Sequence, residues 1–320
     1  MMKKNILLTV CLAMIGILSM NAQNSIVALH HEGKVTLYAG GATQAAMDAS
    51  VKGDTLYLSE GMFGGFNVTH GIVVLGSGEK TIVSGDITIT GNTEKKDLGD
   101  YVFFGLNLLN NFVVNDSVKG FKMNQCQMTN FDIKSGKFVD AAEICMSYIK
   151  GMLDMNTNSA SNNHVYGLDV LNSKINRVDN GGANTGAITF FNCNIKSMLS
   201  ASSKNTFTNC IIGPITIYYG SFVNCLYQSN SSGATFSNCW KDGDWSFDDD
   251  LNCSYSDEEL QSKGYLGTDG TIIGITGGVQ PYTLELFAPH IVEHKLDVDN
   301  VNKTLKVTLK MSSDATKSGE

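Results

Sequence analysis

One short motif, Phe-x-Asn-Cys, recurs four times in the second half of the chain and constrains the fold more than any other feature. The copies span residues 190–193, 207–210, 222–225 and 236–239. Their cysteines lie 17, 15 and 14 residues apart. Weaker relatives lie upstream at 123–126, 142–145 and 167–170, and an earlier one lies around 104–108. An apolar motif that recurs at such a period is typical of a solenoid.

The spacing inside the motif predicts a solenoid of strands rather than of helices. Phe190 and Ile195 are five residues apart, as are Phe207 and Ile212, and an odd separation would put them on opposite faces of a straight strand. A bend must therefore lie between them. Because Asn tolerates the left-handed conformation that such a bend needs, the Asn-Cys pair is expected to mark a corner between two short strands. Stacked corners would give ladders of Phe, Asn and Cys. A helical solenoid would need longer periods and longer amphipathic runs, which are not evident after residue 50.

The N-terminus reads as a secretory signal. Lys3 and Lys4 precede an apolar run from Ile6 to Leu18, and small or polar residues follow at 20–23. We expect cleavage after residue 22 and a secreted, periplasmic or cell-surface protein. The run is shorter than the roughly 20 residues of a membrane span. Loss of the two lysines takes the formal charge from -8 to -10, which disfavours nucleic acid and anionic membranes as partners.

Three further segments resemble a known family. Residues 42–50 with 53–61 resemble the capping helix and first coil of right-handed parallel β-helices of the pectin-lyase-like superfamily, and 72–81 resembles their second coil. Residues 270–278, followed by Pro281 and Tyr282, resemble the closing coil of secreted β-helix proteins of Bacteroidetes. The resemblance covers roughly residues 30–285. It implies an all-β, right-handed parallel β-helix with a short N-terminal capping helix, and it specifies activity poorly because one fold hosts many functions.

These features divide the chain into a signal peptide at 1–22, a β-helix domain at 23–285, a C-terminal β-hairpin at 286–311 and a disordered tail at 312–320. In the hairpin, alternating strands flank a polar turn at 300–303. Its expected role is to cover the open end of the solenoid, where strand edges would otherwise be unpaired. We expect a monomer.

The seven cysteines that remain after processing are expected to be mostly free. An odd number cannot all pair, and directly stacked parallel strands do not suit disulfide geometry. The four repeat cysteines are therefore interpreted as a ladder of small buried hydrophobes. Cys239 with Cys253 is the pair that best fits a disulfide. Zinc is disfavoured because the repeat has no Cys-x-x-Cys and no nearby His.

The catalytic patterns of the family's enzymes are not recognisable here. A uronate lyase needs basic groups or a cation to neutralise the sugar carboxylate and a base to take a proton, yet Arg177 is the only arginine. A hydrolase needs paired carboxylates with basic neighbours, and an esterase pattern is also absent. The resemblance therefore carries no catalytic residue over.

Two acidic groups remain as candidates. Asp132, Asp154 and Asp179 lie 22 and 25 residues apart, so they are expected to stack on successive coils and share a face with Arg177. Such a row would raise a pKa or recruit calcium. Alternatively, these are solvated outward residues, relieved by Lys134, Lys150 and Lys196. Calcium is also a candidate ligand of the acidic run Asp248, Asp249 and Asp250, although this run lacks regular oxygen spacing. No other cofactor is expected.

Two functions follow from these observations. The first is a secreted or surface β-helix without catalytic activity that binds an extracellular polysaccharide or a host or cell-surface glycan, as an adhesin does. The alternative is a divergent polysaccharide lyase or hydrolase acting on an acidic polysaccharide. An enzyme should show an open groove lined by several charged and aromatic side chains, whereas a purely structural solenoid should not.

Overall fold

The structure is a computed structural model that describes residues 25–90, 100–134, 138–155, 164–179, 188–200, 205–215, 220–229, 233–284, 290–299 and 304–312. The predicted signal peptide and residues 313–320 of the predicted tail lie outside these ranges. So do residues 156–163, which precede His164 in the sequence.

A small cap begins the fold. Strand β1 (Ile26–His31) pairs antiparallel with β2 (Lys34–Ala39) and with β3 (Thr55–Leu58). Between β2 and β3 lie a 3-10 turn, η1 (Gly40–Ala42), and the helix α2 (Thr43–Ala49), which buries Ala46 and Met47 in the core. The predicted N-terminal helix is thus present where the sequence placed it.

Ten coils follow. Each adds one parallel strand to one sheet, and to a second sheet the first four coils add two strands each and the last six add one each. The strands of the first four coils are β3, β4 (Gly61–Phe63), β5 (Phe66–Val68), β6 (Val73–Leu75), β7 (Thr81–Val83), β8 (Ile87–Ile89), β9 (Val102–Phe104), β10 (Asn107–Leu108), β11 (Phe112–Val114), β13 (Lys122–Asn124), β14 (Gln127–Met128) and β15 (Phe131–Ile133). The 3-10 turn η2 (Gly78–Lys80) precedes β7, and β12 (Val118–Lys119) pairs with β16. The later strands are β16 (Phe138–Cys145), β17 (Tyr148–Asp154), β18 (His164–Leu171), β19 (Lys174–Asp179), β20 (Ile188–Phe191), β21 (Asn194–Ser200), β22 (Thr206–Thr208), β23 (Ile211–Ile212), β24 (Ser221–Val223), β25 (Leu226–Tyr227), β26 (Thr235–Ser237) and β27 (Trp240–Lys241).

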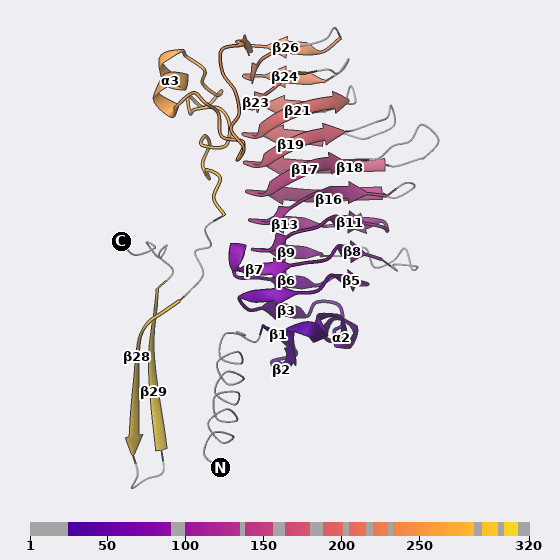
Figure 1. The fold of residues 1–320 in the computed structure, drawn as a ribbon, viewed down its shortest axis with the longest axis vertical. Coiled ribbons are helices and arrows are strands. Elements are labelled where there is room, and N and C mark those ends of the chain that lie inside the picture. Colours follow the sequence, from indigo (N-terminus) through magenta and orange to yellow (C-terminus); the bar gives the residue numbers. More distant parts are fainter. Residues whose placement is uncertain are drawn as a thin grey trace, which may run out of the picture.

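The two sheets run the length of the column (Figure 1). Sheet A has 13 strands in the order β2-β1-β3-β6-β9-β13-β16-β18-β20-β22-β24-β26, with β12 beside β16. Sheet B has 14 strands and forks: β17 continues into one arm through β14, β10, β7 and β4 and into another through β15, β11, β8 and β5. The first four coils therefore have three strands each, and the later ones have two. The parallel solenoid predicted from the repeat is confirmed.

From β9 onward, the corner after each sheet A strand on the path of stacked coils is a residue in the left-handed conformation. Asn192, Asn209, Asn224 and Asn238 have φ between 49° and 55°, as expected for the bend inside the motif. Upstream, the same corner is formed by Gln125, Met146 and Asn172, with φ of 50°, 45° and 44°. The strand register therefore corrects two of the upstream relatives: the motif lies at 144–147 and 170–173, not at 142–145 and 167–170.

The predicted ladders fill the interior of the later coils. Phe190, Phe207, Phe222 and Phe236 stack with centroid separations of 4.7, 4.6 and 5.0 Å. All seven described cysteines are free, and those of the first three repeats are fully buried. Cys239 and Cys253 are not joined, contrary to the pairing that best fitted the sequence. The thiols donate to backbone carbonyls instead, as Cys225 does to Phe207 at 3.4 Å.

After β27 the chain turns back along the solenoid as a strap, defined here as residues 242–284. It contains α3 (Asp257–Ser262), whose first turn is closed by a capping box between Ser256 and Glu259. The strap covers the outer face of β23, β25 and β27 with a second apolar core, made by Ile211, Leu226, Trp245, Leu260 and Ile273. The strap then passes the row of left-handed corner residues and ends beside Gln125. The Nε2 of Gln125 donates to the Thr283 carbonyl at 3.2 Å.

The last two strands, β28 (His290–Asp299) and β29 (Thr304–Ser312), pair antiparallel around the predicted polar turn. The strap reaches Gln125 at Thr283, and the five residues that link it to β28 lie outside the described ranges. That this hairpin covers the open end of the solenoid stays a prediction.

Candidate functional site

The three aspartates form the row that their spacing predicted. Asp132 is paired in register with Asp154, and Asp154 with Asp179. All three are half-buried, and they point outward because their neighbours Leu153 and Val178 fill the interior. Burial raises the pKa of Asp132, and the carboxylate of Asp154 raises it further. Lys134 opposes this rise, because its Nζ lies 3.7 Å from Asp132 Oδ2. The row therefore contains one carboxyl group that holds its proton more tightly than an exposed aspartate.

Arg177 shares the outer face of this row. It is exposed and lies two residues before Asp179 on β19, with buried Val178 between them. Lys150 and Lys196, on the flanking strands, are also exposed. Within the described ranges, no three His, Cys, Asp or Glu side chains converge as a metal site. The row is thus a line of interspersed charges of both signs.

The acidic run 248–250 has a structural use in the strap. One carboxylate oxygen of Asp248 accepts from the backbone N–H groups of Asp250 and Asn252 at 2.9 and 2.8 Å, and the other accepts from Asn252 Nδ2. These bonds lower the pKa of Asp248, with the Asn252 side chain as the largest cause. The Asp249 backbone carbonyl accepts from the hydroxyl of Tyr148 at 3.1 Å. The run closes its own turn rather than presenting three carboxylates to one ion.

A buried lysine, which sequence reasoning missed, fastens this turn to sheet B. Lys174 is 8 % exposed, and its Nζ donates to Asn252 Oδ1 at 2.8 Å and lies 4.8 Å from the ring centre of Tyr282. Burial lowers the pKa of Lys174, while Asp250 and Asp248 act in the opposite direction. A lysine two residues after a corner, where the later repeats have asparagine, isoleucine, leucine and tryptophan, is the signal that would have found it.

An open groove of about 370 Å³ lies on the outer face of sheet B, beside the strap. Its lining consists of Asn176, Lys196, Ser197, Pro214, Gln228, Ser246 and Phe247. Two contacts hold its wall: Gln228 Nε2 donates to the Trp245 carbonyl at 2.6 Å, and the Phe247 ring packs edge-on against Trp245 with centroids 5.0 Å apart. Arg177 pairs in register with Ser197, which lines the groove. The aspartate row therefore lies on the same outer face of sheet B as the groove.

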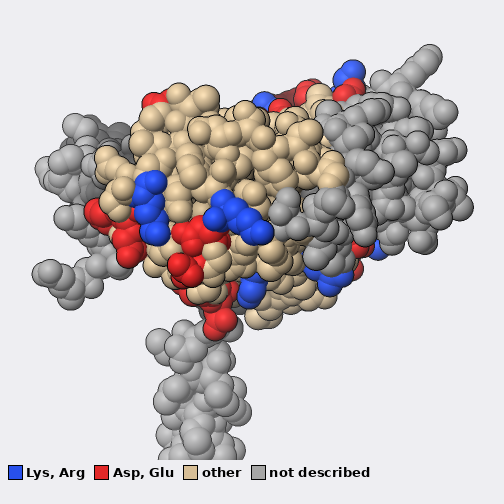
Figure 2. Space-filling model, turned by 90° about the horizontal axis from the view of Figure 1, so that it is seen from above, with Lys and Arg blue, Asp and Glu red and all other residues tan. Residues whose placement is uncertain are grey.

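On the end of the column, charges of both signs lie close together. Figure 2 shows Lys and Arg side chains next to Asp and Glu side chains at the edge of the end face, with a broad uncharged surface above them. Such a surface does not concentrate a polyanion strongly.

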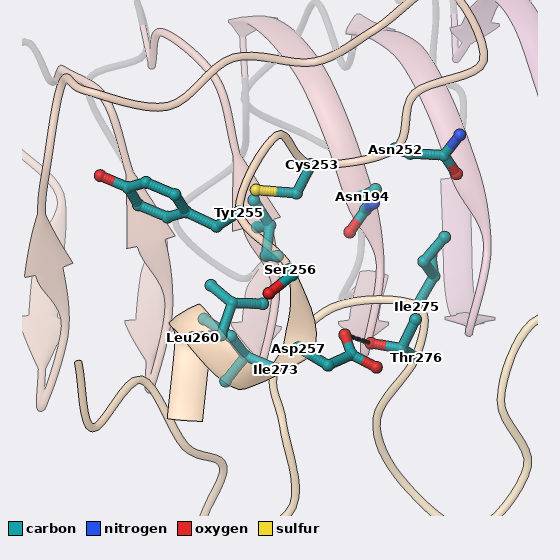
Figure 3. Close-up of a pocket in the computed structure, with 11 residues that line it drawn as sticks. Asn194, Asn252, Cys253, Tyr255, Ser256, Asp257, Leu260, Ile273, Ile275 and Thr276 are labelled. Atoms are coloured by element: carbon teal, nitrogen blue, oxygen red, sulfur yellow. Dashed lines mark hydrogen bonds between the residues drawn. The ribbon is translucent and has the colours of Figure 1, made fainter. Parts of the chain in front are cut away.

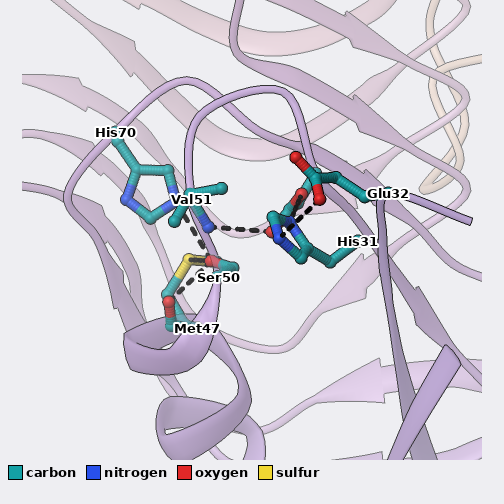
Figure 4. A network of polar contacts seen from close by, with 7 residues as sticks. His31, Glu32, Met47, Ser50, Val51 and His70 are labelled. Atoms are coloured by element: carbon teal, nitrogen blue, oxygen red, sulfur yellow. Dashed lines mark hydrogen bonds and ion pairs between the residues drawn. The ribbon is translucent and has the colours of Figure 1, made fainter. Parts of the chain in front are cut away.

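A histidine network at the N-terminal cap resembles a nucleophile with its base, but its hydrogen bonds exclude that role (Figure 4). Ser50 Oγ donates to the Met47 carbonyl at 2.6 Å, so the single hydroxyl hydrogen is used. His70 Nε2, 3.0 Å from Ser50 Oγ, must then be the donor. Burial also lowers the pKa of His70, which keeps the ring neutral. The network ends α2 and does not activate the serine.

The chain matches no protein-family model, and comparisons with curated proteins and with solved structures give no match. In the described part of the chain, no helix is both long enough and apolar enough to cross a bilayer.

Proposed function

We propose that this protein is an extracellular, right-handed β-helix of the pectin-lyase-like kind that binds a glycan without cleaving it. The groove on sheet B carries the proposal. It offers amides, hydroxyls, a single lysine and a partly exposed aromatic ring on a rigid sheet, and these groups suit a chain of sugar rings with many hydroxyls and apolar C–H faces. The N-terminal signal sequence supports an extracellular location.

The electrostatics favour a neutral or weakly charged glycan over a polyuronate. Among the described residues that line the groove, Lys196 is the only cation, and the mature chain is expected to carry about ten excess negative charges. Arg177 lies two residues before Asp179 on the same strand, and Lys150 Nζ lies over the ring of Tyr148, 5.8 Å from its centre. A chain of uronates would be repelled by the aspartate row unless a cation intervened.

Affinity electrophoresis and calorimetry against neutral and acidic polysaccharides, with and without calcium, test this proposal. We expect binding to a neutral glycan without release of reducing ends or unsaturated products. Replacing Lys196 by Ala or Phe247 by Leu should each weaken binding about fivefold, because each removes one contact worth about 1 kcal/mol. Lys241→Ala, an exposed lysine outside the groove, serves as the control and should change nothing.

Two outcomes would overturn the proposal. If neither Lys196→Ala nor Phe247→Leu weakens binding, the groove is not the glycan-binding site. Products released by the wild-type protein and lost in Arg177→Ala would show instead a polysaccharide lyase or hydrolase centred on the aspartate row.

A further inference from the structure

The strap covers apolar residues on the outside of sheet B. Under it lies a pocket of about 210 Å³ (Figure 3), whose apolar walls are shielded from solvent. Leu260 and Ile273 of the strap are 2 % and 0 % exposed. Asn194 Oδ1, which has no partner among the described residues, is buried against Gly274. The C-terminal part of the chain thus serves here as a cover for the outer face of a sheet.

Sheet A carries an apolar surface of its own at the N-terminal end of the column, called here the sheet A patch. The neighbours of its members along each strand, such as Leu56, Val74 and Phe103, are buried, so the members lie on the outer face. Leu37, Val35 and Tyr57 are 66 %, 62 % and 47 % exposed. The strand register aligns the members in two files: Leu37, Ala28, Tyr57, Leu75 and Phe104 form one, and Val35, His30, Thr55, Val73 and Val102 form the other.

All members of the patch are apolar except His30 and Thr55, and those less exposed than Tyr57 are still partly accessible. In the next strand, β13, the two files continue with Lys122 and Asn124, where the patch ends. A continuous apolar surface of this kind on the outside of a protein marks a contact site.

The strap delivers the chain to the border of this patch. Gln125, which follows Asn124, donates to the Thr283 carbonyl at 3.2 Å. Seven peptide units join Thr283 to His290, the first residue of β28, and they span at most about 25 Å. The patch crosses four strand spacings between β2 and β9, which is about 19 Å. The hairpin formed by β28 and β29 therefore reaches every part of the patch from its point of attachment.

The sequence of this hairpin has the pattern that a covering element needs. Apolar and polar positions alternate over 296–298 and 305–311, and the apolar ones are Leu296, Val298, Leu305, Val307, Leu309 and Met311. The register pairs Leu296 with Val307, and on the other face Asp297 with Lys306. The apolar positions from 305 to 311 extend over about 20 Å, which matches the length of the patch. A hairpin of two strands is marginally stable alone in water and needs a surface to pack on.

We propose that the C-terminal hairpin packs its apolar face on the sheet A patch of the same chain. In Figure 1 the hairpin stands apart from both sheets, and the proposed contact brings it onto sheet A. The short link gives the two surfaces a high local concentration, which favours the chain's own hairpin over that of a second copy. The open end beside β26, where the sequence places the hairpin, is the competing position. The coil beyond β26 lies seven strand spacings from β13, which is about 34 Å and exceeds the span of the link to β28.

Hydrogen exchange of the intact protein, measured by mass spectrometry, tests the contact. Tyr57→Asp places a charge at the centre of the patch, and the amides of 290–312 should then exchange at least about tenfold faster than in the wild type, because an undocked hairpin opens readily. Met62→Asp is the matched control. Met62 is 60 % exposed on β4 of sheet B, and its replacement should leave the exchange of the hairpin unchanged.

A reciprocal pair of variants lies in the hairpin. Val307→Asp should uncover the patch and increase the fluorescence of bound anilinonaphthalene sulfonate severalfold, whereas Thr308→Asp, at the next position of β29, should not. Sedimentation velocity should show a monomer whose hairpin protection does not depend on protein concentration.

Three results would overturn the proposal. A hairpin that stays protected in Tyr57→Asp covers another surface, such as the open end. A hairpin that exchanges freely in the wild type is not docked. Protection that grows with concentration, together with a dimer, would assign the patch to the hairpin of a second copy.

Discussion

Between β20 and β26 each coil contributes one phenylalanine to a stack in the solenoid interior, and successive rings are inclined by 7° to 18°. Between β9 and β15, Phe103, Phe112, Phe121 and Phe131 meet instead at angles from 4° to 75°. The later coils have two strands each, and their stacked rings all come from one position of sheet A. The earlier coils have three strands each, and their rings come from both sheets, Phe103 from sheet A and Phe112 and Phe131 from sheet B. The same fold can thus be periodic in sequence in one half and aperiodic in the other.

The largest expected effect tests the stack directly. Phe207→Ala should lower the free energy of unfolding by about 3 to 5 kcal/mol, because the ring is fully buried between two others. Phe112→Ala, in the earlier coils, should cost a similar amount because burial and not periodicity sets the loss. Phe236→Ala should cost about half as much, since this ring is partly exposed at the end of the column.

Denaturant unfolding of the three variants measures these differences. Equal losses for Phe207→Ala and Phe236→Ala would show that burial within the stack does not govern its contribution. A much smaller loss for Phe112→Ala would show that the two halves differ in energy as well as in geometry.

A smaller effect concerns the corners. Met146 occupies the left-handed conformation that asparagine occupies in the later coils, so Met146→Asn should stabilise the protein by about 1 kcal/mol. The reverse change, Asn209→Met, should destabilise it by about 2 kcal/mol, because it also removes the acceptor for Asn224 Nδ2 at 3.2 Å. Both changes in stability are measured from the thermal unfolding midpoints of the two variants and the wild type. A destabilising Met146→Asn would mean that side-chain packing, and not backbone conformation, selects the residue at that corner.

The smallest expected effect concerns the N-terminal cap, where His31 Nδ1 lies 2.7 Å from Asp54 Oδ1. The hydrogen bond to Asp54 raises the pKa of His31. For Asp54, burial alone would raise the pKa, but bonds from the Val51 N–H and His31 outweigh it and lower the pKa. The stabilisation by His31 is therefore lost as pH rises through its raised pKa, and that by Asp54 is lost as pH falls through its lowered pKa. His31 and Asp54 both contribute their full stabilisation only between the ordinary pKa values of aspartate and histidine, about pH 4 to 6.5.

Unfolding midpoints measured across pH for wild type and His31→Gln check this window. The wild-type advantage should be largest between about pH 4 and 6.5 and should vanish at alkaline pH. His30→Gln, at the neighbouring exposed histidine, should follow the wild type throughout. An advantage of the same size at all pH values would contradict the ionic origin of the contact.

The sequence by itself determined the parallel strand solenoid, the left-handed corners and the ladders of Phe and Cys. These features depend on contacts between equivalent positions of adjacent coils, so they repeat along the chain and are visible as a period. It also determined that Asp132, Asp154 and Asp179 stack, because their spacing equals the length of one coil. The two misplaced upstream motifs show the limit: Met146 and Asn172 precede serine rather than cysteine, so the motif letters were absent although the conformation was retained.

Only the tertiary structure decided the strap and the two cavities beside it. The unpartnered Asn194 oxygen lies under a segment about 60 residues later in the chain, and no period links the two. The run 248–250 shows the same limit, since its turn is set by Asn252 and by a lysine from a distant coil. Contacts between coils repeat and leave a pattern in the sequence, whereas each contact of the strap occurs once, and its energy becomes apparent only when the chain has folded back on itself.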